Sequence, residues 1–306
     1  MQYIPLTPQD EKEMLARIGV ASFDDLIDQI IPKDFQFTGK CGLPEAKSEH
    51  EVRRLLHEVA AKNLNNLQTV SFMGAGIYDH YIPAIIDSLI SRSEFYTAYT
   101  PYQAEVSQGT LQTIFEYQSA ICELTGMDVS NASMYDGGSA LAEACHLACS
   151  LKRKPKAILA DSIHPYYRRI TETYTRECGL HVITCPSRNG ILDIEKLSEM
   201  IGDDTSCVCV QHPNFLGYLE DMAAIEKLVH QKDILFIAVV DPVSLGVLMP
   251  PRDYNADVAV GEGQAMGIAQ GFGGPLLGVF TSKIDYVRSL PGRIVGETTD
   301  IEGKRG

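Results

Sequence analysis

Residues 234–278 read ILFIAVVDPVSLGVLMPPRDYNADVAVGEGQAMGIAQGFGGPLLG, and this stretch decides the fold class of the chain. An apolar run over 235–241 closes with Asp241, and a second run over 258–260 leads into the glycine-rich segment 261–278. Both runs have the β-branched content of buried strands. Ligands of open α/β sheets usually bind beyond the carboxyl ends of the strands. Asp241 and the glycine-rich segment are therefore predicted to border a ligand site.

The pattern of apolar strands separated by helices extends over most of the chain. Further strands are predicted at 157–160, 182–185, 207–211 and 277–281, with helices at 194–201 and 222–231. This alternation predicts an α/β fold with a mostly parallel sheet flanked by helices. Residues 1–70 are charged and helix-patterned, with Thr7 and Ser48 as N-caps. We expect an N-terminal helical arm over 1–70, a large domain over 71–290 and a polar tail over 291–306.

Charge and hydrophobicity exclude several classes of protein. The formal net charge is -14, which repels phosphate backbones and anionic lipids, so nucleic-acid and membrane-surface binding are disfavoured. The apolar run over 234–240 is too short to cross a bilayer. The first residues, MQYIPLTPQDEKEM, do not have the basic and apolar regions of a secretory signal. A cytoplasmic protein is expected.

The eight cysteines fit a reducing compartment. Cys145 and Cys149 are one helical turn apart, and Cys207 and Cys209 share one face of a predicted strand. A structural metal site needs four converging ligands, and the sequence contains no C-x-x-C pair. We therefore expect small buried thiols and no metal.

The glycine-rich segment GEGQAMGIAQGFGGPLLG looks like the lysine-bearing turn of a pyridoxal-phosphate (PLP) enzyme, but Gln264 stands where the lysine is expected. A PLP enzyme needs one amine to hold the cofactor as an internal aldimine, and glutamine cannot form a Schiff base. The segment is neither a P-loop nor a G-x-G-x-x-G turn that opens a helix, which argues against nucleotide binding.

Three further segments could contribute to a site. In SFMGAGIYDHYIP, residues 71–83, the glycines allow a close approach of backbone, although a tight turn with a hydrogen-bonded core histidine is the alternative. The segment YTAYTPYQAEVSQG, residues 96–109, is either a surface for a ligand or partner or a tyrosine-rich packing loop. In NASMYDGGSALAEACHLAC, residues 131–149, the Asp-Gly-Gly-Ser run opens a helix whose N–H groups either bind phosphate or are capped locally.

Together these segments and DPVSLGVLMPP resemble subunit 1, the alpha or N-terminal half, of the glycine cleavage system P protein, the decarboxylating glycine dehydrogenase. The resemblance implies the aspartate-aminotransferase-like fold of PLP fold type I, with the C-terminal small domain missing. It also implies an inactive copy that pairs with a lysine-bearing subunit 2, in which PLP is held. The implied reaction is glycine decarboxylation followed by aminomethyl transfer to the lipoyl group of H protein.

The resemblance leaves this chain alone without catalytic residues and without covalently bound cofactor. It implies a vestigial cofactor site formed by Asp136, Gly137, Gly138, Ser139, Asp241 and Gln264. It also implies that one segment reaches the partner's active site through Tyr99, Thr100, Tyr102, Gln103 and Glu105. Two alternatives stay open. One is a self-sufficient PLP enzyme, an aminotransferase or a desulfurase, that uses another lysine such as Lys283. The other is a structural or regulatory partner with no catalytic role.

Overall fold

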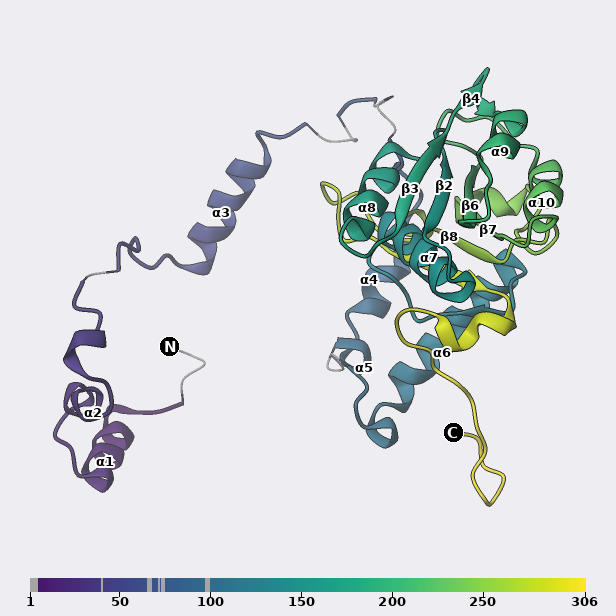
Figure 1. Ribbon diagram of the computed structural model, residues 1–306. Helices are drawn as coiled ribbons and strands as arrows, with labels where there is room; N and C mark the ends of the chain where they lie inside the picture. Colours follow the sequence, from purple (N-terminus) through teal and green to yellow (C-terminus); the bar gives the residue numbers. More distant parts are fainter. Residues whose placement is uncertain (1–4, 40, 65–67, 71, 73–74, 97–99) are drawn as a thin grey trace. The chain divides into compact units, whose positions relative to one another are not determined.

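The computed structural model of the chain describes all residues except 1–4, 40, 65–67, 71, 73–74 and 97–99, and it divides into two units, residues 1–65 and 66–306 (Figure 1). The first unit contains the helices α1 (Pro8–Ile18), α2 (Phe23–Ile30) and α3 (Glu49–Ala60), with a short 3-10 turn at Lys33–Phe35. Thr7 and Ser48 form capping boxes at the starts of α1 and α3, which confirms both predicted N-caps. No residue of these three helices is buried.

The second unit contains a seven-stranded sheet in the order β1-β9-β8-β7-β6-β2-β3. Its strands are β1 (Val129–Ser130), β2 (Lys156–Ala160), β3 (His181–Cys185), β6 (Thr205–His212), β7 (Leu235–Val240), β8 (Val258–Glu262) and β9 (Gly278–Ser282). The strands from β8 to β3 in this order pair in parallel, and β9 pairs antiparallel with both β8 and β1. The prediction of a mostly parallel sheet flanked by helices is confirmed. A separate hairpin joins β4 (Ser187–Arg188) to β5 (Ile191–Leu192).

The helices of this unit cover the sheet on both sides. They are α4 (Ile85–Ile90), α5 (Ser93–Tyr96), α6 (Gln108–Thr125), α7 (Gly137–Lys152), α8 (Pro165–Thr175), α9 (Ile194–Met200) and α10 (Met222–His230). Figure 1 shows α7 and α8 on one side of the sheet and α9 and α10 on the other. Short 3-10 turns follow three strands, at Pro242–Gly246, Gln264–Met266 and Ile284–Ser289. A fourth lies at Ala104–Val106, ahead of α6.

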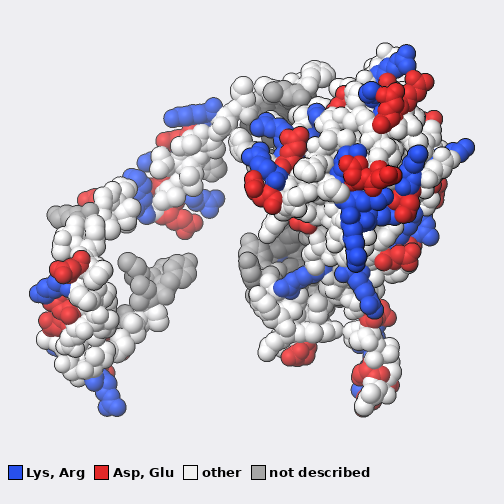
Figure 2. Space-filling view, viewed as in Figure 1, with Lys and Arg blue, Asp and Glu red and all other residues white. Residues whose placement is uncertain are grey.

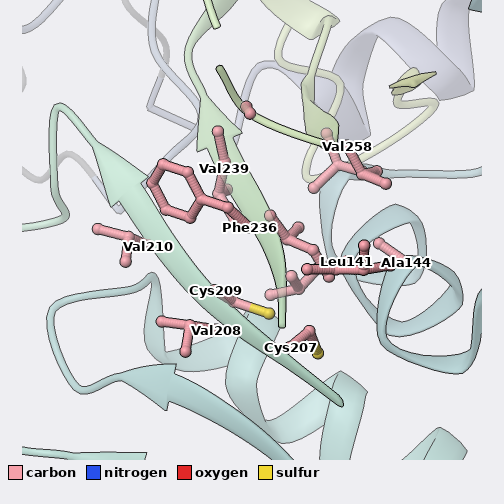
Figure 3. Packing of buried hydrophobic residues seen from close by; sticks show 14 of the residues in the cluster. Leu141, Ala144, Cys207, Val208, Cys209, Val210, Phe236, Val239 and Val258 are labelled. Carbon is pink, nitrogen blue, oxygen red and sulfur yellow. The ribbon is translucent and has the colours of Figure 1, made fainter. Parts of the chain in front are cut away.

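The core lies between α7 and the central strands. Every residue of β7 is buried, which explains its uninterrupted apolar sequence. Figure 3 shows Leu141 and Ala144 of α7 next to the strand that carries Phe236. Gly138 permits α7 to approach α8 closely, since a Cβ on it would lie 2.6 Å from Cδ1 of Ile170. A glycine at the start of α7 thus lets its N-terminus pack closely against α8.

Charged side chains cover the outside of this core. Figure 2 shows Lys and Arg interspersed with Asp and Glu on the face in view. No helix among the described residues is long and apolar enough to span a membrane.

Candidate functional site

A cavity of about 210 Å³ lies beyond the carboxyl ends of β6, β7 and β8. Gln211 of β6, Val240 of β7 and Glu262 of β8 line it, together with Asp241, which directly follows β7. Parallel strands place their carboxyl ends at one edge of a sheet, so these residues meet although they are far apart in sequence. The expectation that Asp241 and the glycine-rich segment border one site agrees with this lining.

Glu262 is held in the cavity by three backbone hydrogen bonds. Its Oε2 accepts a hydrogen bond of 3.0 Å from the backbone N–H of Gly137, and its Oε1 accepts bonds of 3.0 and 2.9 Å from the N–H groups of Gln264 and Leu277. Burial raises the pKa of Glu262, while these three bonds act in the opposite direction. The carboxylate therefore takes up an anion position at the N-terminus of α7.

Three N–H groups of the predicted helix start at 136–139, those of Asp136, Gly137 and Ser139, are engaged within the chain. Asp136 caps α7 by accepting a 2.9 Å bond from the N–H of Ser139, whose Oγ lies 3.1 Å from the N–H of Asp136. The N–H of Gly137 donates to Glu262. A Cβ on Gly137 would lie 2.7 Å from the hydroxyl of Tyr167, so glycine is needed for this close packing. The helix start is capped by two acidic side chains.

Gln264 is buried, with 2% of its surface exposed, and lines the same cavity. Its side-chain amide donates to the carbonyl of Ile268, and this bond turns the side chain toward its own loop. Neither lysine nor arginine is among the described residues that line the cavity. The nearest lysine in sequence, Lys283, instead pairs with Asp257 at 2.7 Å. Asp257 precedes β8, so this pair lies at the opposite end of the strand from Glu262.

His164 forms the aromatic wall of the cavity. It follows β2 and caps α8, where its Nδ1 accepts a 3.1 Å bond from the N–H of Tyr166. Its ring stacks on Tyr167 at 4.5 Å between centroids and meets Phe215 edge-on at 4.7 Å. Burial raises the pKa of Tyr167, so this phenol stays protonated.

The predicted close approach of backbone in segment 71–83 occurs at this histidine. Nε2 of His164 lies 2.7 Å from the carbonyl oxygen of Ala75. Gly76 has a φ of +91°, and a Cβ on it would lie 2.6 Å from the imidazole ring. Tyr78 and His80 of the same segment also line the cavity, whereas Gly74 lies outside the described residues. A glycine is thus required where the segment passes the ring.

None of the described residues of the tyrosine-rich segment lines the cavity. Tyr102 is 81% exposed, and the guanidinium of Arg293 lies 5.8 Å above its ring. Gln103 and Glu105 are exposed, Thr100 is half-buried, and Tyr99 lies outside the described residues. Their role at a partner's site stays a prediction.

Sequence reasoning did not assign roles to Glu262, His164 or Tyr167. The signal for His164 was available, because a histidine followed by proline lies a few residues after a buried strand and opens a helix. Glu262 had no comparable signal. Its role depends on the start of α7, which is 125 residues away in sequence.

The fold and the cavity define an α/β protein with a mostly parallel sheet, whose cavity at the carboxyl ends of the strands has no lysine among its described lining residues. The chain is similar to the glycine cleavage system P-protein family over residues 1–306. It is 51% identical over 306 residues to the probable glycine dehydrogenase (decarboxylating) subunit 1 of Carboxydothermus hydrogenoformans, covering 100% of this chain and 69% of that protein. It is 50% identical over 305 residues to the probable subunit 1 of Geobacillus thermodenitrificans, covering 100% of this chain and 68% of that protein.

Two solved structures are also similar. The crystal structure of a glycine decarboxylase (P-protein) of the glycine cleavage system, in inhibitor-bound form, has a TM-score of 0.91 and 44% identity and covers 100% of this chain and 68% of that one. A sphingosine-1-phosphate lyase from Burkholderia pseudomallei has a TM-score of 0.61 and 14% identity, covers 90% of this chain and 68% of that one, and supports the fold alone. The chain belongs to the glycine cleavage system P-protein family, and its curated relatives are subunit 1 of glycine dehydrogenase (decarboxylating).

Proposed function

We propose that this chain is the subunit of the P protein that does not hold PLP, and that it completes the active site of a lysine-bearing subunit 2. The family links the chain to a PLP-dependent system with a second subunit. The residues of this chain do not fit the cofactor. The cavity contains a buried glutamine in the expected lysine position, and Glu262 takes the anion position at the start of α7.

The acid at the helix start is the observation that carries this proposal. The N-terminus of a helix favours an anion through its free N–H groups and its dipole. A phosphate group at α7 would have to displace Glu262, which accepts three backbone hydrogen bonds, and its charge would lie next to Asp136. Gln264 has no amine whose positive charge could offset the repulsion between the phosphate and these acidic side chains. Noncovalent binding and covalent attachment of PLP are thus both disfavoured in this chain.

The reaction of the assembled protein, as we propose it, is glycine decarboxylation with transfer of the aminomethyl group to the lipoyl group of H protein. Within that assembly, Thr100, Tyr102, Gln103 and Glu105 contact the partner near its reacting groups, and Tyr99 belongs to the same segment. The exposure of Tyr102 and Gln103 supports this placement, because hydroxyl and amide groups of an exposed segment are available to a partner.

The test compares the isolated chain, the isolated lysine-bearing subunit and the mixture of both. Each sample is incubated with PLP, reduced with borohydride and mapped by peptide mass spectrometry, and glycine–bicarbonate exchange is measured in parallel. We expect a PLP-lysine adduct only in subunit 2, and exchange only in the mixture. An adduct on this chain would contradict the proposal and would favour a self-sufficient PLP enzyme.

The remaining alternative is a structural or regulatory partner, and the same samples distinguish it. If subunit 2 alone exchanges glycine carboxyl at the rate of the mixture, this chain has no part in the active site. Co-purification without any gain in exchange would lead to the same conclusion. A self-sufficient enzyme based on Lys283 is disfavoured by its ion pair with Asp257, away from the cavity.

A further inference from the structure

Three cysteines converge in the core between α7 and β6. Cys145 of α7 and Cys207 and Cys209 of β6 are fully buried, and their sulfur atoms all lie within 4.8 Å of one another. The sulfurs of Cys145 and Cys209 are 3.6 Å apart. Figure 3 shows the sulfurs of Cys207 and Cys209 on the side of β6 that faces Leu141 and Ala144 of α7. The expectation of small buried thiols did not include this convergence, which only the packing of α7 on β6 produces.

The spacing of the triad fits an ion with three bonds to sulfur. A bond from a thiophilic ion to sulfur is about 2.3 Å long, so three sulfurs lie roughly 4 Å apart around a planar ion and roughly 3.5 Å apart around a pyramidal centre such as trivalent arsenic. The 3.6 Å between the sulfurs of Cys145 and Cys209 agrees with the pyramidal arrangement, and all three sulfurs lie within 4.8 Å of one another. Two of the three thiols are also held rigidly, because β6 pairs in parallel with β2 and β7 on either side. The site therefore needs little rearrangement of its ligands.

The surroundings decide which kind of ion is compatible. All three cysteines belong to the apolar core cluster, where an uncompensated charge is costly. Three thiolates leave a charge of minus one around Zn²⁺ and minus two around Cu⁺, whereas trivalent arsenic leaves none. We propose that Cys145, Cys207 and Cys209 form a three-thiol site for a trivalent thiophilic ion, with arsenite as the probe.

The binding step involves no change of oxidation state. Arsenous acid, As(OH)₃, reacts with three thiols to give one As(SR)₃ group and three waters. Three As–O bonds and three S–H bonds break, while three As–S bonds form, and each thiol proton leaves with a hydroxyl group as water. Entry requires local opening of α7 from β6, so binding is slow and accelerates at low urea concentration.

The test uses the full chain, reduced with a phosphine and freed of small thiols. After incubation with arsenite and gel filtration, intact mass spectrometry gives the number of arsenic atoms per chain, and arsenic X-ray absorption gives the number of sulfur neighbours. We expect one arsenic with three sulfur neighbours. Cys145→Ala, Cys207→Ala and Cys209→Ala should each lose that species, and Cys149→Ala and Cys178→Ala should retain it. Cys149 is adjacent to the triad on α7, and Cys178 is exposed.

A second measurement does not depend on whether the variants fold. Hydrogen exchange of the wild-type chain should slow upon arsenite addition within 137–152 and 205–212, the segments of α7 and β6. The proposal is overturned by an absence of bound arsenic, by two sulfur neighbours, by protection confined to other segments, or by unchanged occupancy in a folded Cys207→Ala variant. It is also overturned if Zn²⁺ displaces arsenite from the site at equal concentration.

Discussion

Replacing Glu262 by glutamine tests the most specific contact of the cavity. The carboxylate accepts backbone hydrogen bonds from Gly137, Gln264 and Leu277. Glutamine is nearly isosteric, but its amide nitrogen cannot accept a hydrogen bond. With its carbonyl oxygen placed toward Gln264 and Leu277, its NH₂ group faces the N–H of Gly137, which is then left without an acceptor. A buried unsatisfied donor costs roughly 1–3 kcal/mol, so we expect Glu262→Gln to lower the free energy of unfolding by about that amount.

Urea unfolding at neutral pH measures this difference, with Glu105→Gln as the matched control at an exposed position. The control should change stability by less than about 0.5 kcal/mol, as surface substitutions usually do. Because burial raises the pKa of Glu262, the folded wild type binds this proton more tightly than the unfolded chain. The free energy of unfolding of the wild type then falls as pH rises above 4.5 through the raised pKa of Glu262. The difference in this free energy between the wild type and Glu262→Gln becomes smaller over the same range. Equal stability of Glu262→Gln and wild type across this pH range would show that the Glu262 carboxylate does not hold these three backbone N–H groups.

Three further outcomes are expected. Tyr102→Phe keeps the aromatic ring that contacts the Arg293 guanidinium, so we expect Tyr102→Phe and Gln103→Ala to leave the melting temperature unchanged. Both variants should lower glycine decarboxylation by the assembled protein about tenfold or more. Early melting with unchanged turnover per folded complex would show that the segment only packs within the chain. The isolated chain should self-associate, since apolar side chains such as Phe272, 95% exposed, lie uncovered; sedimentation of a stable monomer at high concentration would contradict this. The hydrogen bond with His230 lowers the pKa of Glu226 from 4.5, so the ionised carboxylate stabilises the fold above pH 4.5 and this stabilisation is lost as pH falls through the lowered pKa. In acid unfolding, the free energy of unfolding of Glu226→Gln should therefore fall less steeply with pH than that of the wild type. An equal dependence on pH would exclude this contribution.

Local sequence signals were sufficient to predict the longer strands of the second unit. The apolar runs at 157–160, 182–185, 207–211 and 235–241 correspond to β2, β3, β6 and β7 within one or two residues at each end. The runs of β2, β6 and β7 are informative because a strand that is buried on both faces is apolar throughout and does not show the polar alternation of a half-exposed strand. Strands of two residues, such as β1 and the hairpin strands, have too little pattern to be recognised.

The arrangement of the candidate site was only partly predictable. Asp241 directly follows the apolar run of β7, Gln264 lies in the glycine-rich turn that follows β8, and both line the cavity. Asp136 was expected at a helix start, and it caps α7 there. The predicted domain limits, the localisation and the role of the tyrosine-rich segment stay predictions.

The sequence by itself determined that the chain is an α/β protein with a lysine missing from its glycine-rich turn, since both conclusions depend on neighbouring residues. Tertiary structure alone decided that Glu262 takes the anion position at the start of α7, that Gly76 passes beside His164, and that Cys145 meets Cys209. The physical reason is the parallel topology. Crossover helices bring the ends of strands distant in sequence to one edge, and no local pattern records which side chains meet there.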